Sequence, residues 1–251
     1  MHALQKDRFY GVRVEAAEAL GKYKPKKGAE ILMSSMPRQD NRVKRACIRS
    51  LNSYKTKEVK DFLIETMMTA DNDYTVNDAY TTLFAVDSTA ADSLYDWAME
   101  QESHSETIRS AALGILTEEK SDSNLATLKE MAVYGAAPYN LRGSIFRRIA
   151  NYREEYPDLI DYFADHINDK SRSVRGMCAN QIIRHGNVEQ FADVLEMADG
   201  EPLRGGRIAD IYATLDSRLA KLKKSKKRKG AREVEKMQKM FAESAEEWGN
   251  N

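Results

Sequence analysis

The chain has 251 residues, 42% hydrophobic and 31% charged, so it can form a packed core but is more polar than a single compact globule usually is. Its 39 basic and 39 acidic residues give a formal net charge of zero, which argues against a protein drawn as a whole to nucleic acid or to an anionic membrane. No segment approaches the roughly 18 consecutive apolar residues of a membrane span, and residues 1–7 lack the apolar core of a signal peptide. We therefore expect no membrane partner, and the sequence leaves the compartment open.

One pattern recurs seven times along the chain, at spacings of 29 to 33 residues. In each copy an aliphatic anchor is followed by a residue, usually apolar, five positions later and by an apolar residue eight positions later. These offsets fall on one face of an α-helix, so each anchor predicts an inner helix. The anchors are Val12, Val43, Val76, Ile108, Leu141, Val174 and Leu203.

Second amphipathic segments lie between the inner helices, at residues 29–36, 59–68, 90–99, 125–133, 159–167 and 188–197. Capping or turn residues separate them from the anchored helices: Gly28, Asn72, Asp122, Asp158, Asn187 and Gly200. A two-helix unit of about 32 residues is too short to bury its own core and must stack on its neighbours. We therefore predict an all-α protein, an α-solenoid of about seven short two-helix repeats over residues 1–220; the alternative is an irregular helical bundle.

A basic segment and a C-terminal helix are expected over residues 221–251. Residues 221–232 carry a charge of +8, whereas residues 233–251 sum to −3. The basic segment could contact phosphates, but it has no interleaved aromatic residues, and the acidic helix after it could fold back on it. We favour a solvated linker and expect at most weak, salt-sensitive nucleic-acid binding.

The repeats resemble HEAT-like repeats. Residues 3–21 and 40–51 are similar to the HEAT-like repeats of bilin-lyase-type proteins, and more closely to the C-terminal helical region of bacterial zinc aminopeptidases of the aminopeptidase N family. The phrase from Ala3 to Gly21, with its aromatic pair before Gly-Val-Arg, looks like the opening of that region. The resemblance implies a non-catalytic domain that packs on a catalytic domain and shapes peptide access.

The catalytic elements of such an aminopeptidase are absent from this sequence. Zinc there needs H-E-x-x-H and a downstream Glu, because two imidazoles and a carboxylate leave a position open for water. None of the four histidines forms this motif, and the substrate-anchoring G-A-M-E-N type of loop is missing. We expect no catalytic residue, metal or cofactor in this chain, with zinc confined to an upstream catalytic domain.

The beginning of the sequence also favours a domain that belongs to a larger protein. It is expected to start with an inner helix whose apolar stripe, Val12, Ala16 and Leu20, has no preceding layer. An uncovered stripe is unfavourable in water, so we expect this segment to be covered by an upstream domain.

A base follows most anchors and forms a row: Arg13, Lys44, Arg109, Arg142, Arg175 and Arg204. These bases could face an anionic ligand along a groove. We favour a structural interpretation, in which they pair with acids such as Asp7, Asp40 or Asp169 and join one repeat to the next.

Eleven residues past four of the anchors stand Tyr23, Tyr54, Tyr152 and His185. They could form an aromatic strip for peptides, although such residues more often close the core between repeats. Cys47 and Cys178 share one repeat position and are expected to be buried thiols too far apart for a disulfide.

Three functions remain open after the sequence alone. The chain could be the C-terminal solenoid of a zinc aminopeptidase, with the upstream catalytic domain as its partner. It could be a free-standing module that binds another protein or a peptide, and nucleic-acid binding through the tail is the least favoured of the three.

Overall fold

The computed structural model describes residues 2–118, 120–136, 139–200 and 205–249, and within these ranges all regular structure is helical. The chain divides into two compact units, Met1–Asn124 and Leu125–Asn251, each of which is described by itself. Among the described residues, no helix combines the length and the apolar character that crossing a bilayer requires. The predicted fold class, an all-α solenoid of stacked helical repeats, is confirmed.

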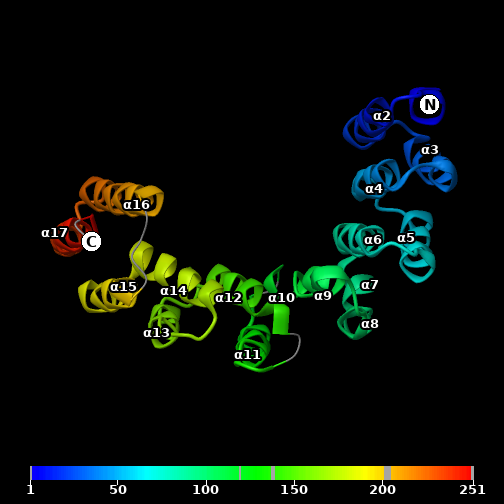
Figure 1. Cartoon of the computed structure of the whole chain (residues 1–251). Coiled ribbons are helices and arrows are strands. Elements are labelled where there is room, and N and C mark those ends of the chain that lie inside the picture. The colour runs from blue at the N-terminus through cyan, green and yellow to red at the C-terminus, as the bar shows by residue number, and fades with distance from the viewer. Residues whose placement is uncertain (1, 119, 137–138, 201–204, 250–251) are drawn as a thin grey trace. The chain divides into compact units, whose positions relative to one another are not determined.

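The first unit stacks helices in two layers (Figure 1). Its inner layer consists of α2 (Tyr10–Tyr23), α4 (Asn41–Ser50), α6 (Asp73–Val86) and α9 (Thr107–Ala112), each packed against the next. Its outer layer contains α3 (Gly28–Ser35), α5 (Lys57–Thr69), α7 (Ser88–Asp92) and α8 (Tyr95–Glu100). The shorter elements are α1 (His2–Lys6), η1 (Met36–Arg38), η2 (Leu51–Ser53), η3 (His104–Glu106) and α10 (Ile115–Glu118).

The second unit repeats the arrangement. Here α12 (Arg142–Asn151), α14 (Arg172–His185) and α16 (Gly205–Lys224) form the inner row, in which α14 packs against both of the others. The remaining elements are η4 (Tyr139–Leu141), α13 (Leu159–Asp165), α15 (Val188–Gly200) and α17 (Arg228–Gly249); α11 (Asp122–Met131) begins just before the division between the units. The helix α17 packs against α15 and α16.

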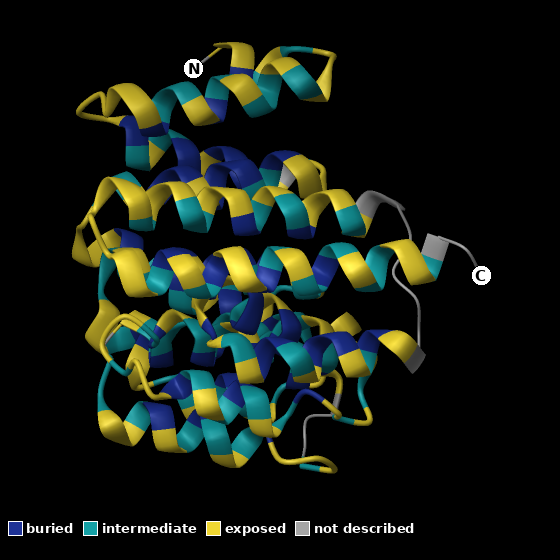
Figure 2. Ribbon diagram, turned by 90° about the vertical axis from the view of Figure 1, so that its left-hand side faces the viewer, coloured by how far each residue is buried: buried dark blue, intermediate teal, exposed yellow. Residues whose placement is uncertain are grey.

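The predicted repeat positions form the core. Five of the seven anchors, Val43, Val76, Ile108, Leu141 and Val174, are buried, and the helices keep their buried and exposed residues on different faces (Figure 2). Side-chain caps start several helices: the Asn72 side chain accepts the Thr75 amide, and Asn187 exchanges hydrogen bonds with Gln190 in a capping box. The seventh anchor, Leu203, lies outside the described residues.

Three expectations need correction or refinement. The first inner helix does not begin the stack, because α1 packs on α2 and buries Leu4 completely; Val12 nonetheless stays 40% exposed. The segment at residues 90–99 is two short helices, α7 and α8, instead of one. The expected domain boundary after residue 220 falls inside α16, since this helix continues to Lys224 and forms a hairpin with α17.

Candidate functional site

The row of bases is partly used to join repeats. The Arg13 guanidinium lies 3.0 Å from the carboxylate of Asp40, which also caps α4 through the amides of Arg42 and Val43. Arg142 makes a bidentate pair with Asp169, at 2.6 and 2.5 Å, and Asp169 also accepts the Ser171 amide. In both pairs the acid stands 27 residues after the base and precedes the next inner helix, as the structural interpretation of the row expects.

The other members of the row behave differently. Arg109 pairs with Glu106 in its own helical turn and donates to the Met99 carbonyl, while Arg175 donates to the Asp169 carbonyl. Lys44 is half-buried. Arg204 lies outside the described residues, so the structure does not place it.

The four residues of the suggested aromatic strip differ in their exposure to solvent. Tyr152 is fully buried, and the Tyr54 hydroxyl donates 2.6 Å to the Leu20 carbonyl between two repeats. Tyr23 is 74% exposed at the end of α2, and His185 lies at the end of α14. Tyr54 and Tyr152 therefore close the core between repeats, whereas His185 lines a hollow of the second unit.

The thiols Cys47 and Cys178 are both free and buried, as predicted. Burial raises the pKa of each to about 12, so neither is a thiolate at neutral pH. Within the described residues no group of three or more His, Cys, Asp and Glu side chains is placed to hold a metal ion.

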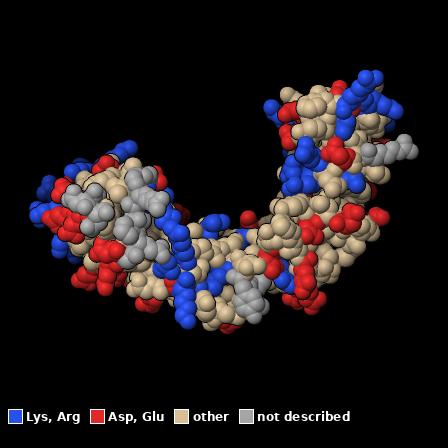
Figure 3. Space-filling view, in the orientation of Figure 1, with Lys and Arg blue, Asp and Glu red and all other residues tan. Residues whose placement is uncertain are grey.

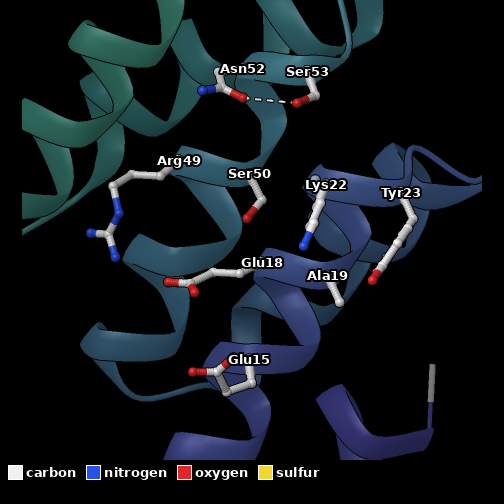
Figure 4. A pocket seen from close by; sticks show the side chains of 10 residues that line it. Glu15, Glu18, Ala19, Lys22, Tyr23, Arg49, Ser50, Asn52 and Ser53 are labelled. Carbon is white, nitrogen blue, oxygen red and sulfur yellow. Dashed lines mark hydrogen bonds between the residues drawn. The ribbon is translucent and has the colours of Figure 1, made fainter.

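An open pocket of about 580 Å³ lies in the first unit between the ends of α2 and α4 (Figure 4). Glu18 and Arg49 point to one side of it and Tyr23 lies on the other. The Arg49 guanidinium is already bound to Asp78, at 2.9 Å. The pocket is therefore lined by both acids and bases, and one of its bases, Arg49, already has an ion-pair partner.

A longer groove lies in the second unit, between α14 and α16. Two adjoining hollows of about 900 and 760 Å³ share Asn180, Asp210 and Thr214, and we call the two together the α14–α16 groove. Both volumes fall in the range typical of ligand sites, roughly 300 to 1,000 Å³. One end has apolar side chains, among them Met177, Ile183 and Met197. The lining side chains include seven bases, Arg153, Arg172, Arg175, Arg184, Arg207, Arg218 and Lys221, and one acid, Asp210.

The groove has a positive electrostatic environment. Burial lowers the pKa of Arg218, whose guanidinium donates to two neutral acceptors, the carbonyls of Ile183 at 3.0 Å and Gly186 at 2.5 Å. Burial, and then the nearby charges of Arg153 and Arg218, lower the pKa of His185 to about 4, although part of its ring meets solvent. His185 is therefore neutral at pH 7, and the positive charge comes from the bases around it.

The basic segment adjoins this groove. Its bases lie at the end of α16, in the turn, and in the first turns of α17, all of them exposed, and Lys223 pairs with Glu235 at 2.8 Å. Lys and Arg side chains gather at the α16–α17 end of the second unit and again over α14 (Figure 3). The basic segment thus covers the end of α16, the turn and the start of α17, and the acidic part of α17 folds back on α16.

Two of the predicted residues, Arg175 and His185, line the groove, but the sequence did not single out most of its bases, because the predicted row contained only the residue directly after each anchor. Arg153 and Arg184 stand 12 and 10 positions after their anchors, just beyond the last apolar position of α12 and α14. Bases past the apolar stripe of successive inner helices are the signal that could have identified them.

The comparison with protein families agrees with the repeat architecture. A family model described as HEAT repeats matches residues 1–84. No curated protein matches the chain. Among solved structures, the chain is similar to one in the complex of CpcE and CpcF of phycocyanin lyase from Nostoc sp. PCC7120, at 15% identity and a TM-score of 0.43, over 86% of this chain and 92% of that one. At least the first third of the chain is therefore similar to HEAT repeats in sequence.

Proposed function

We propose that the chain is a non-catalytic scaffold that binds another protein through grooves along its inner helices. The observation that carries the proposal is the α14–α16 groove, which is open and combines apolar side chains with seven bases and the single acid Asp210 among its described lining residues. Exposed apolar surface rimmed by charge is typical of interaction sites. HEAT-like repeats provide extended surfaces of this kind because each repeat contacts only its neighbours.

Site-specific photo-crosslinking tests this function. We expect p-benzoylphenylalanine in place of Met177, within the groove, to crosslink to a protein partner in cells that express the chain from its own gene. The same group in place of Glu196, exposed on α15, is the matched control and should give no such product. Equal crosslinking at both positions, or no protein product at Met177, would contradict the proposal.

The zinc aminopeptidase parent is a finer hypothesis, supported by the sequence resemblance at residues 3–21. The HEAT-repeat match does not distinguish this parent from other scaffolds. A reading frame that continues upstream into H-E-x-x-H and a later Glu would support the parent. For the chain alone we expect no hydrolysis of aminoacyl substrates and no stoichiometric zinc, measured by chromogenic assay and metal analysis; turnover with one zinc per chain would refute this.

A further inference from the structure

We infer that the α14–α16 groove binds an acidic, partly apolar segment of a partner protein. The inference rests on the proposed scaffold function and specifies the chemistry of its partner. It follows from the charge, the apolar lining and the dimensions of the groove.

The first argument is uncompensated charge. In the described part of the chain no carboxylate lies within ion-pair distance of Arg153, Arg184, Arg218 or Lys221, and Arg184 donates 2.6 Å to the Asn180 amide oxygen. Asp210 is the one acid among the described lining residues, so the bases outnumber it and repel one another. Carboxylates of a ligand would relieve this repulsion and accept charge-assisted hydrogen bonds.

The second argument is the apolar end of the same groove. Met177 and Met197 are half-buried there, beside the buried Ile183 and Ile211. Methionine side chains adapt to apolar groups of different shape. Arg172, Arg175 and Arg207 line the same end, so a ligand that fills the whole groove combines apolar groups at this end with acidic groups.

The third argument is length. The 14 residues of α14 span about 21 Å, which matches an extended peptide of about six residues. A segment of this length could place one or two apolar side chains near Met177 and acidic side chains near Arg184 and Lys221.

Nucleic acid fits the groove less well. Apart from His185, the described lining residues include no aromatic ring on which a base could stack. The apolar side chains at that end, Met177, Ile183 and Met197, also offer a phosphate backbone no hydrogen-bond donor. Phosphates could also reach the exposed bases of the α16–α17 hairpin, so nucleic acid and anionic lipid belong in the test as competitors.

Fluorescence anisotropy on the full chain provides the test. The probes are a labelled peptide of alternating Glu and Leu, the same peptide with Gln for Glu, a peptide of Glu alone, and a labelled 20-base-pair duplex; flotation with phosphatidylserine vesicles tests lipid. We expect the Glu-Leu peptide to bind at least tenfold more tightly than the Gln-Leu peptide and the Glu peptide. It should also bind more tightly than the duplex at physiological salt.

Two double variants locate the site. Arg184→Ala with Lys221→Ala should weaken Glu-Leu peptide binding at least tenfold, since each removes a charged donor from the groove. Lys236→Ala with Lys239→Ala removes the same charge from exposed positions on α17 and should change the affinity less than twofold. Circular dichroism melting confirms that both variants fold.

Several results would overturn the inference. These are absence of peptide binding, equal affinity for the Glu and Gln versions, equal loss in the two double variants, or tighter binding of the duplex or vesicles than of the peptide. If crosslinking at Met177 still captures a protein while the acidic peptide fails, the scaffold function stands and the acidic partner is rejected. If crosslinking and peptide binding both fail, the scaffold function and the acidic partner are both rejected.

Discussion

Replacing Arg142 with alanine should destabilise the second unit far more than replacing Arg13 destabilises the first. The two arginines hold the same repeat position and each pairs with an acid of the next repeat. They differ in burial: the side chains of Arg142 and Asp169 are 9% and 8% exposed, and those of Arg13 and Asp40 are 18% and 45% exposed. The pair of Arg142 is also bidentate, whereas Arg13 makes one hydrogen bond to Asp40, so burial and geometry both favour the larger effect at Arg142.

The expected magnitudes follow from desolvation. Removing Arg142 leaves the Asp169 carboxylate buried with the Ser171 amide as a remaining donor, and breaking a buried pair in this way costs about 3 to 5 kcal/mol. We expect the lower end, about 3 kcal/mol, because that donor remains. Arg13 pairs with a carboxylate that solvent already reaches, so its loss should cost about 1 kcal/mol or less.

The pH dependence gives a second measure of the same pair. The hydrogen bond from Arg142 lowers the pKa of Asp169 below its ordinary value of 3.8. A carboxyl whose pKa is lower in the folded state stabilises the fold above that ordinary value, and the stabilisation is lost as pH falls below it. The free energy of unfolding of the Arg142→Ala variant should therefore fall less than that of the wild type between pH 5 and pH 2.

Urea unfolding followed by circular dichroism, at pH 7 and at acidic pH, measures both effects. A tryptophan signal from each unit, Trp97 in the first and Trp248 in the second, shows which unit responds, since stacked repeats need not unfold together. Equal destabilisation by Arg142→Ala and Arg13→Ala, or a loss below 1 kcal/mol for Arg142→Ala, would refute the reasoning.

Three other predictions follow. An added Cβ at Gly28 would lie 1.9 Å from the Tyr54 hydroxyl oxygen, so Gly28→Ala should lower the free energy of unfolding by about 1 to 3 kcal/mol. Gly176→Ala, with open space around the new Cβ, should raise it by about 0.5 kcal/mol. Thermal melts of the two variants test both expectations. His185 has a folded pKa of about 4, below its ordinary 6.5, so stability should fall as pH drops from about 6.5 toward 4, and NMR titration of the ring should show no transition near 6.5. Burial raises the pKa of Cys47 to about 12, so it should react with Ellman's reagent at pH 8 only after urea unfolds the chain; fast native reaction would contradict its burial.

The helical repeats could be predicted from sequence because their signals are local. An aliphatic anchor and an apolar residue eight positions later define a helix face through the 3.6-residue period alone, whatever the helix packs on. The pairing of Arg13 with Asp40 was also within reach, since both residues stand at fixed positions in successive repeats. The break between α7 and α8, and the short α1 ahead of the first anchor, lie outside the regular pattern and were not predicted.

The groove and the environment of each candidate residue were decided by tertiary structure. Tyr23, Tyr54 and Tyr152 occupy equivalent sequence positions, yet one is exposed, one half-buried and one fully buried, because the neighbouring helices cover them to different extents. Arg184 and Lys221 stand far apart in the sequence and meet only because α14 packs against α16. The period of a helix fixes which side chains share its face, but the packing of one helix on another determines which faces remain open and which charges lie together.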